Sequence, residues 1–210
     1  MDSYLTLATD GEALFTEKRS KFYAFAYHIE SEEDAKSYVA ALRKKFYDAR
    51  HICYAYALGY DAATTRANDD GEPSGSAGKP ILGQIRSAGL TFTFVAVVRY
   101  FGGVKLGTGG LAVAYKTSAA EAIAAATIEE RLVMANFTIE IPYPDADTAM
   151  RYIRDGEGEI TARDYTDTTT LLTITIRTSL LEPLRERLAK IHTLRFVEEE
   201  EHTELETTTD

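Results

Sequence analysis

The 210-residue chain is acidic, with 33 Asp and Glu residues against 23 Lys and Arg residues and a formal net charge of −10 at pH 7. Hydrophobic residues make up 45% of it, which is enough for a real core and suits one large domain or two small ones. No apolar run approaches the ~20 residues of a membrane span, and the first residues lack a basic leader. The single Cys53 excludes an internal disulfide. From these features we expect a cytoplasmic protein.

The charge is spread unevenly along the chain. Residues 1–134 hold 15 Lys and Arg against 16 Asp and Glu, whereas residues 135–210 hold 8 against 17. Neither half is therefore a basic surface that coats nucleic acid, and any RNA contact has to be a local patch. Seven of the 17 acidic residues follow Val197, and the acidic tail at 201–210 is expected to be disordered.

The first half of the chain alternates predicted strands and helices. A run at 92–100 is apolar throughout and predicts a central strand, and a run at 51–60 has apolar residues on both faces. Ser31-x-x-Asp34 is a helix-start signal of the capping-box type. The expected elements are a strand at 22–29, a helix at 31–46, a strand at 51–60, a polar loop at 61–78, a short helix at 81–88, a strand at 92–100 and a helix at 111–126.

After residue 131 the pattern changes to strand–helix–strand–strand–helix–strand, which is the βαββαβ order of a ferredoxin-like domain. Ser179 is expected to cap the last helix, with Pro183 near its first turn. We predict an α+β protein of two domains, at 1–134 and 135–200. The elements of the second domain are strands at 136–142, 159–165, 171–178 and 193–197, and helices at 145–154 and 179–191.

The segment R-Y-F-G-G-V-K-L-G-T-G-G at 99–110 carries five glycines in twelve residues between a predicted strand and a predicted helix. Free amides at a helix N-terminus, flanked by Arg99 and Lys105, form a candidate anion site. It is not a Walker A loop, and its match to a dinucleotide fingerprint comes too late in the chain. The alternative is a tight turn that packs the helix against the strand. The glycines concerned are Gly102, Gly103, Gly107, Gly109 and Gly110.

The polar loop holds three carboxylates in four positions, which can ligate a hard cation such as Mg²⁺. The spacing is not that of an EF-hand, and the serines nearby lack the nucleophile elbow of a hydrolase. The alternative is a surface turn in which Asp, Gly and Pro satisfy the backbone geometry. The candidate residues of this acidic loop are Asp69, Asp70, Glu72, Ser74 and Ser76.

His51 opens a predicted strand beside Arg50, shortly before the acidic loop. Its imidazole suits a general base or a phosphate partner, and the alternative is a strand-end histidine with structural hydrogen bonds only. Lys79 follows the acidic loop and joins the candidate anion site. Cys53 lies among apolar neighbours and is expected to be a small buried residue rather than a nucleophile.

Four motifs occur in the order K-R-S-K-F at 18–22, H-I-C-Y-A-Y at 51–56, D-D-G-E-P-S-G-S-A-G-K-P-I-L at 69–82 and R-Y-F-G-G-V-K-L-G-T-G-G at 99–110. Together they resemble the YigZ/IMPACT family over residues 1 to about 130. The remainder resembles the small C-terminal domain of the bacterial YigZ branch. The resemblance implies an N-terminal domain like the second domain of a small-subunit ribosomal protein, and a C-terminal ferredoxin-like domain similar to one of elongation factor G.

The same resemblance implies a cytoplasmic role in the regulation of translation, with RNA, the ribosome or a translation factor as partner and neither DNA nor a membrane. Eukaryotic relatives act by protein–protein binding that restrains a stress-responsive translation kinase pathway. No catalytic assignment comes with the motifs, so we expect binding without a cofactor. The alternative is a Mg²⁺-dependent phosphotransferase or hydrolase that uses the acidic and glycine-rich loops. The shared motif positions are His51, Asp69, Asp70, Gly71, Glu72, Pro73, Gly75, Gly78, Lys79, Pro80, Arg99, Gly102, Gly103, Lys105, Gly107, Gly109 and Gly110.

Overall fold

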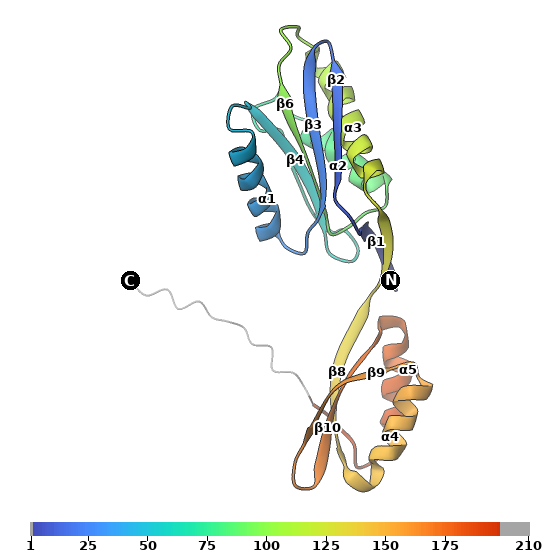
Figure 1. Cartoon of the computed structure of the whole chain (residues 1–210). Coiled ribbons are helices and arrows are strands. Elements are labelled where there is room, and N and C mark those ends of the chain that lie inside the picture. Colours follow the sequence, from blue (N-terminus) through green and yellow to red (C-terminus); the bar gives the residue numbers. More distant parts are fainter. Residues whose placement is uncertain (1, 198–210) are drawn as a thin grey trace. The chain divides into compact units, whose positions relative to one another are not determined.

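The structure, a computed structural model, describes residues 2–197. The described chain forms two compact units, one of residues 3–131 and one of residue 2 together with residues 132–197 (Figure 1). The tail predicted to be disordered, at 201–210, lies outside the described residues. Among the helices described, none combines the length and the apolar character needed to cross a membrane.

The first unit is built on a five-stranded sheet in which every neighbouring pair is antiparallel. The order across the sheet places β6 at the centre, as its uniformly apolar sequence predicted. From one edge to the other the strands are β2 (Gly11–Glu17), β3 (Ser20–His28), β6 (Thr93–Tyr100), β4 (His51–Leu58) and β5 (Thr64–Asn68).

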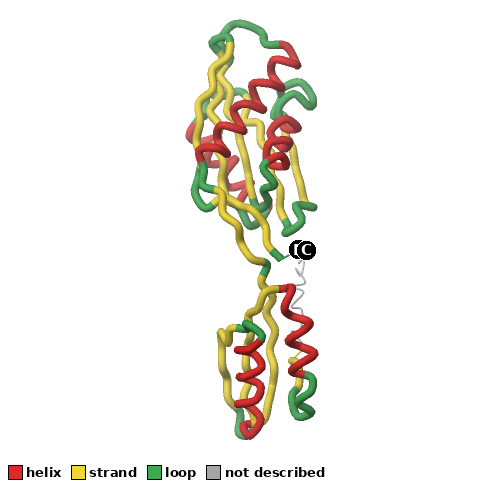
Figure 2. Tube along the Cα trace, turned by 90° about the vertical axis from the view of Figure 1, so that its right-hand side faces the viewer, coloured by secondary structure: helices red, strands yellow, loops and turns green. Residues whose placement is uncertain are grey.

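Helices cover both faces of this sheet, because successive strand residues point to opposite sides. On one face, α1 (Glu32–Lys45) packs on aromatic and branched residues such as Ile52 and Phe94. On the other face, α2 (Gly78–Ser87) and α3 (Gly107–Ala125) pack on small residues such as Ala55 (Figure 2). Small side chains on that face let two helices lie close to the strands.

A separate two-stranded sheet joins the ends of the first unit. It pairs β1 (Ser3–Leu7) with β7 (Ile128–Leu132). The N–H of Thr91 donates to the carbonyl of Leu5, so this small sheet is also attached to the segment before β6.

The second unit follows the predicted βαββαβ order, and the α+β fold class with two domains is confirmed. Its sheet has the order β11-β8-β10-β9, with antiparallel pairing throughout. Both helices lie on the same face of the sheet in Figure 1, where their apolar residues meet Ile139 and Ile174. The elements are β8 (Met134–Pro142), α4 (Tyr143–Asp155), β9 (Glu159–Tyr165), β10 (Thr169–Arg177), α5 (Thr178–Leu188) and β11 (Arg195–Val197).

Several local predictions differ from the structure. The region expected to be a polar loop contains the exposed edge strand β5, and β1, β2 and β7 were not predicted because they are short or mostly polar. Ser179 does not cap α5: the helix begins one residue earlier, no side chain caps it, and Pro183 lies inside it. The capping box of Ser31 and Asp34 at the start of α1 is confirmed by both of its hydrogen bonds.

Candidate functional site

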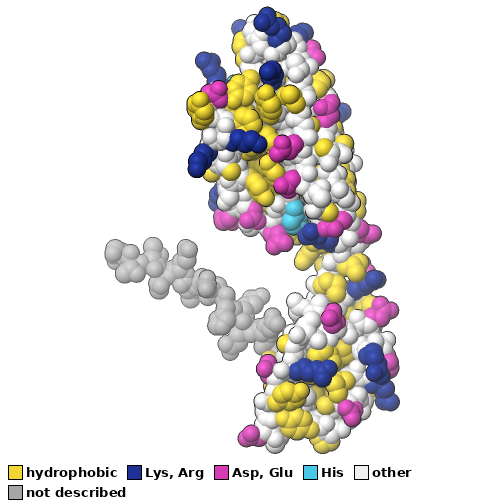
Figure 3. Space-filling model, in the orientation of Figure 1, with side chains coloured by type: hydrophobic (Ala, Val, Ile, Leu, Met, Phe, Trp, Pro, Cys, Tyr) yellow, Lys and Arg dark blue, Asp and Glu magenta, His cyan; other side chains and the backbone are white. Residues whose placement is uncertain are grey.

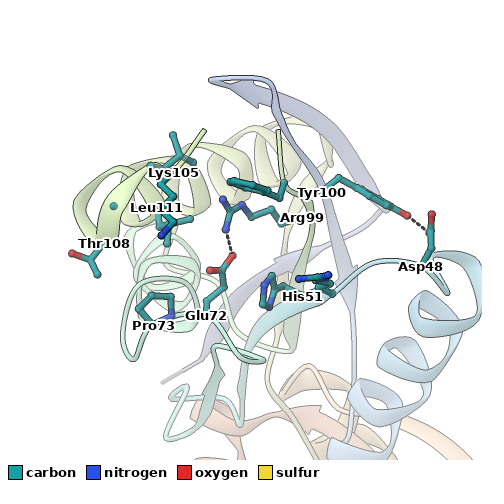
Figure 4. A pocket seen from close by; sticks show the side chains of 13 residues that line it. Asp48, His51, Glu72, Pro73, Arg99, Tyr100, Lys105, Thr108 and Leu111 are labelled. Atoms are coloured by element: carbon teal, nitrogen blue, oxygen red, sulfur yellow. Dashed lines mark hydrogen bonds and ion pairs between the residues drawn. The ribbon is translucent and has the colours of Figure 1, made fainter. Parts of the chain in front are cut away.

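A cavity of about 640 Å³ opens in the first unit where the end of β6, the start of α3, the beginning of β4 and the acidic loop meet (Figure 4). This volume falls within the usual range of ligand sites. The apolar part of its wall comes from Pro73, Tyr100, Phe101, Leu106 and Leu111. Its ionisable side chains other than tyrosine come from Asp48, Arg50, His51, Glu72, Arg99 and Lys105.

The first turn of α3 borders this cavity through Gly107 and Thr108. No side chain caps this end of the helix, and its first turn contains no acidic residue. Gly107 has a φ of +72°, a backbone conformation that glycine adopts freely. Lys105 is exposed beside it. Because the first N–H groups of a helix lack partners within the helix and carry partial positive charge, this end of α3 suits an anion.

Arg99 on β6 and Glu72 in the acidic loop form a buried ion pair in the cavity wall. Nη1 of Arg99 lies 2.6 Å from Oε1 of Glu72, and the two side chains are 8% and 4% exposed. The hydroxyl of Tyr115 on α3 donates to the same oxygen at 2.8 Å. Arg99 is therefore not the free cation that the sequence suggested, because Glu72 neutralises part of its charge. Glu72, likewise, is not free to orient a ligand.

The guanidinium of Arg99 keeps unused hydrogen-bonding capacity. Its Nε–H is buried and has no partner among the described residues, which costs about 1–3 kcal/mol for such a donor. Figure 4 shows the guanidinium reaching from β6 toward α3, with Glu72 beneath it. An anion that enters between this group and the start of α3 gains a charged donor in addition to the helix amides.

A chain of hydrogen bonds continues from this ion pair into the core. The thiol of Cys53 lies 3.3 Å from the hydroxyl of Tyr115 and donates to the carbonyl of Asp69 at 3.0 Å. Burial is the main cause that raises the pKa of the Cys53 thiol and the pKa of the Tyr115 hydroxyl above their ordinary values. The raised pKa values favour the neutral form of both groups, and the prediction that Cys53 is a small buried residue is confirmed.

Asp69 shapes the loop that precedes α2. Its two carboxylate oxygens accept hydrogen bonds from the backbone N–H groups of Gly75, Ala77 and Gly78, at 2.8, 2.9 and 2.8 Å. Burial opposes the charge of this carboxylate, but the three N–H donors outweigh burial and lower the pKa of Asp69 below its ordinary value. Asp69 therefore serves as the cap of α2 that Ala77, its N-cap residue, cannot supply.

Asp70 is also engaged within the protein. It forms an ion pair with Arg43 of α1 and accepts the N–H of Ile52 at 2.6 Å. With Glu72 paired to Arg99, each of the three carboxylates already has protein partners. Among residues 2–197, no group of three or more His, Cys, Asp or Glu side chains is arranged to hold a metal ion.

His51 lies at the start of β4 and is half-buried in the cavity wall. Its Nδ1 is 2.8 Å from the carbonyl of Asp70, which can only accept, so Nδ1 carries the hydrogen. The remaining nitrogen, Nε2, is left to act toward a ligand. The loop thus fixes the tautomer of the one candidate histidine that borders this cavity.

The structure brings together part of the predicted site. Arg99, Lys105, Gly107, His51 and Glu72 line the cavity. The other candidates do not line it: they are Gly102, Gly103, Gly109, Gly110, Lys79, Asp69, Asp70, Ser74 and Ser76.

Two of these other candidates have clear structural roles. A Cβ at Gly102 would lie 2.1 Å from the backbone of Arg19, so this glycine lets two segments pack. The hydroxyl of Ser76 donates to the carbonyl of Pro73 at 2.6 Å, which closes the turn of the acidic loop.

Sequence reasoning missed several residues of the cavity wall. Arg50, Tyr100 and Phe101 are direct neighbours of predicted positions in the sequence, and Thr108 lies between two predicted glycines. Asp48 lies in the turn that follows α1, and only the pairing of β4 with β6 brings that turn close. Adjacency in sequence could have identified the first four.

Comparisons with known proteins agree with this fold. The family model described as the Impact N-terminal domain matches residues 18–123. The IMPACT family member YigZ of Escherichia coli (strain K12) is 34% identical over 167 residues, which is 79% of this chain and 82% of that protein. The IMPACT family member YvyE of Bacillus subtilis (strain 168) is 37% identical over 134 residues, covering 64% of this chain and 62% of YvyE.

A solved structure described as the crystal structure of a hypothetical protein superposes with a TM-score of 0.70 at 31% identity, over 96% of this chain and 99% of that chain. The matched domain carries the cavity, and the similarity to YigZ extends beyond it into the second unit. From the domain match and the relatives together, this chain belongs to the IMPACT family.

Proposed function

We propose that this protein is a cytoplasmic regulator linked to translation, and that it acts by binding an anionic group of its partner in the cavity of the first unit. Family membership supports the link to translation, because the resemblance of the four motifs implies that role. The observation that carries the binding site is the meeting of three donors in one cavity. The uncapped start of α3, the exposed Lys105 and the incompletely bonded guanidinium of Arg99 all border it.

Binding is favoured over catalysis by the state of the acidic residues. Asp69 holds the start of α2, Asp70 pairs with Arg43, and Glu72 pairs with Arg99. A magnesium-dependent reaction at the acidic loop would have to break these contacts first, each of which stabilises the fold. The buried thiol of Cys53 is no better suited to chemistry, because burial raises its pKa.

The proposal is tested by titrating inorganic phosphate into the full chain and following the backbone amide signals by NMR. We expect the signals of Gly107 and Thr108 to shift and saturate, because these two residues at the start of α3 border the cavity. Lys105→Ala should weaken phosphate about tenfold, which corresponds to about 1.4 kcal/mol. The matched control is Lys116→Ala, which removes an exposed lysine of α3 that does not line the cavity.

The link to translation is tested separately by co-sedimentation of the full chain with ribosomes. Bound protein should be released by added phosphate, and Lys105→Ala should sediment less than Lys116→Ala. Phosphate shifts that scatter over the surface, or that survive Lys105→Ala unchanged, would remove the basis for the cavity as the recognition site.

A further inference from the structure

A second groove lies beside the cavity and shares two aromatic residues with it. This groove, of about 470 Å³, is also lined by Tyr100 and Phe101, and its other wall comes from the β2–β3 hairpin through Arg19 and Lys21. The two hollows are therefore neighbours on either side of the end of β6. A ligand larger than one anion can occupy both of them at once.

Phe101 stands between the two hollows and is suited to stacking. Its side chain is 58% exposed, which is unusual for phenylalanine. The guanidinium of Arg99 lies 5.7 Å from its ring, which fixes one side of the ring by a cation–π contact. The exposed part of the ring remains open to a planar group, and nucleobases stack on such aromatic surfaces.

The hairpin that supplies the basic wall has a strained turn. Lys18 and Arg19 have φ values of +46° and +67°, and they connect Glu17 to Ser20 as a two-residue turn. Such turns favour Asn-Gly, because residues with a Cβ adopt this conformation at a cost. Strain of this kind is often kept where a side chain has a function. The turn holds two cations where Asn-Gly would be more relaxed.

The same hairpin is attached to the glycine loop. Gly102 packs directly on the backbone of Arg19 and Ser20, and its N–H donates to the hydroxyl of Ser20 at 3.1 Å. This contact holds the strained turn against the end of β6. Arg19 and Lys21 are thereby kept beside the groove rather than free to move away from it.

The charges of the two hollows contrast with those of the chain as a whole. Their linings contain five Lys and Arg residues and two acidic residues, whereas the whole chain has a net charge of −10. Both acidic residues have partners: Glu72 pairs with Arg99, and Asp48 accepts the hydroxyl of Tyr100 at 2.6 Å. Figure 3 shows one face of the molecule, on which Lys and Arg side chains lie among Asp and Glu side chains. The two hollows form a local basic patch.

We infer that the cavity and the groove together bind the phosphorylated end of a single-stranded RNA, with the terminal phosphate at the start of α3, its base on Phe101, and the next nucleotide along Arg19 and Lys21. This inference rests on the proposed function, since it names the group that the anion site receives. An exposed aromatic ring that borders two hollows lined with cations favours a nucleotide over a simple acidic peptide.

The test uses isothermal titration calorimetry on the full chain with defined probes. These are inorganic phosphate, adenosine, adenosine 5′-monophosphate, and a short oligoadenylate RNA with and without a 5′-phosphate. The monophosphate should bind about tenfold more tightly than phosphate or adenosine, because stacking one base contributes about 1–3 kcal/mol. The phosphorylated RNA should bind more tightly than the monophosphate. The same RNA without its 5′-phosphate should bind more weakly than the phosphorylated RNA.

Two variants separate the parts of the site. Phe101→Ala should remove the advantage of the monophosphate over phosphate while phosphate itself still binds. Arg19→Gly relaxes the turn, so the fold should be at least as stable, and yet the phosphorylated RNA should lose its advantage over the monophosphate. The control is Leu14→Ala, which truncates an exposed apolar residue of β2 outside both hollows.

The outcomes distinguish this inference from the proposed function. If phosphate binds at α3 but the monophosphate gains nothing from its base, the nucleotide inference fails and the anion site stands. If the monophosphate and the phosphorylated RNA bind equally, the site takes a free nucleotide and the inference of an RNA end fails. If phosphate does not bind at all, the proposed function fails as well.

Discussion

Arg99 and Glu72 are 27 positions apart in the sequence, yet their pairing decides the electrostatics of the cavity. The carboxylate lowers the effective charge of the guanidinium and fixes its position through Nη1. The hydroxyl of Tyr115 donates a hydrogen bond to the same carboxylate oxygen of Glu72. The pair therefore makes Arg99 a rigid donor of reduced charge, which suits selective recognition more than strong general attraction of polyanions.

Replacing Glu72 by Gln tests this balance. The amide keeps an oxygen for Tyr115 but removes the charge that pairs with Arg99. Breaking a buried ion pair from one side typically costs about 3–5 kcal/mol, so the free energy of unfolding in urea should fall clearly. The full charge of Arg99 then acts on the cavity, so phosphate should bind more tightly.

The control for this variant is Glu12→Gln, which changes the net charge equally at an exposed position of β2. It should leave both stability and phosphate affinity close to those of the wild type. A Glu72→Gln protein that is less stable but binds phosphate no better would show that the pair does not limit the charge of Arg99.

At the scale of elements, the acidic loop stabilises the start of α2 and positions part of the cavity wall. Asp69 satisfies three N–H groups around the start of α2, and Asp70 ties the loop to α1 and β4. His51 is held by the carbonyl of Asp70. The carboxylates that looked like metal ligands in the sequence thus position the wall instead.

The stability supplied by Asp69 should depend on pH. Its pKa is lowered in the folded protein from the ordinary value of 3.8, so its stabilisation is complete above that value and is lost as the pH falls through the lower folded pKa. Asp69→Asn should be less stable than the wild type at neutral pH, by about 1–3 kcal/mol for an unsatisfied buried donor. Urea unfolding of the wild type and of Asp69→Asn, from neutral pH through the acid range, measures the pH dependence and the difference in stability.

The difference in stability between the two proteins should begin to shrink as the pH falls below 3.8, where the unfolded carboxyl takes up a proton. It should be lost at the lower folded pKa, where the carboxyl of the folded wild type is protonated as well and resembles the amide. A difference that stays constant down to the lowest pH at which both proteins fold would mean that the charge of Asp69 is not what holds the loop.

Periodicity predicted the elements that bury an apolar face, and it failed for those that do not. Apolar residues on both faces of 51–60 and an apolar run at 92–100 identified β4 and β6, because helices cover both faces of these strands. The edge strand β5 reads T-T-R-A-N, is largely exposed, and forms only because β4 offers its backbone. Likewise the glycine loop predicted an anion site at the start of α3, but no sequence pattern could predict that Arg99 forms an ion pair with Glu72.

At the scale of the whole molecule, the chain divides its stability between separate cores. The first unit has one buried cluster on each face of its sheet, and the second unit has a single cluster between its sheet and its two helices. These clusters share no residue. The cavity and the groove draw all their lining from the first unit.

Two matched substitutions test whether the units unfold independently. Ile81 and Ile174 are both fully buried, the first in the core under α2 and the second in the core of the second unit. Changing either to Ala should cost about 2–5 kcal/mol of the stability of its own unit, through lost burial and the cavity left behind. Calorimetry of the full chain should show two unfolding transitions, and each variant should lower the midpoint temperature of only one of them. Phosphate should raise the midpoint temperature of the transition that Ile81→Ala affects and leave that of the other transition unchanged. The reason is that only the unit that binds the ligand gains stability from it. A single transition, or one that phosphate and both variants shift together, would mean that the two cores are energetically coupled.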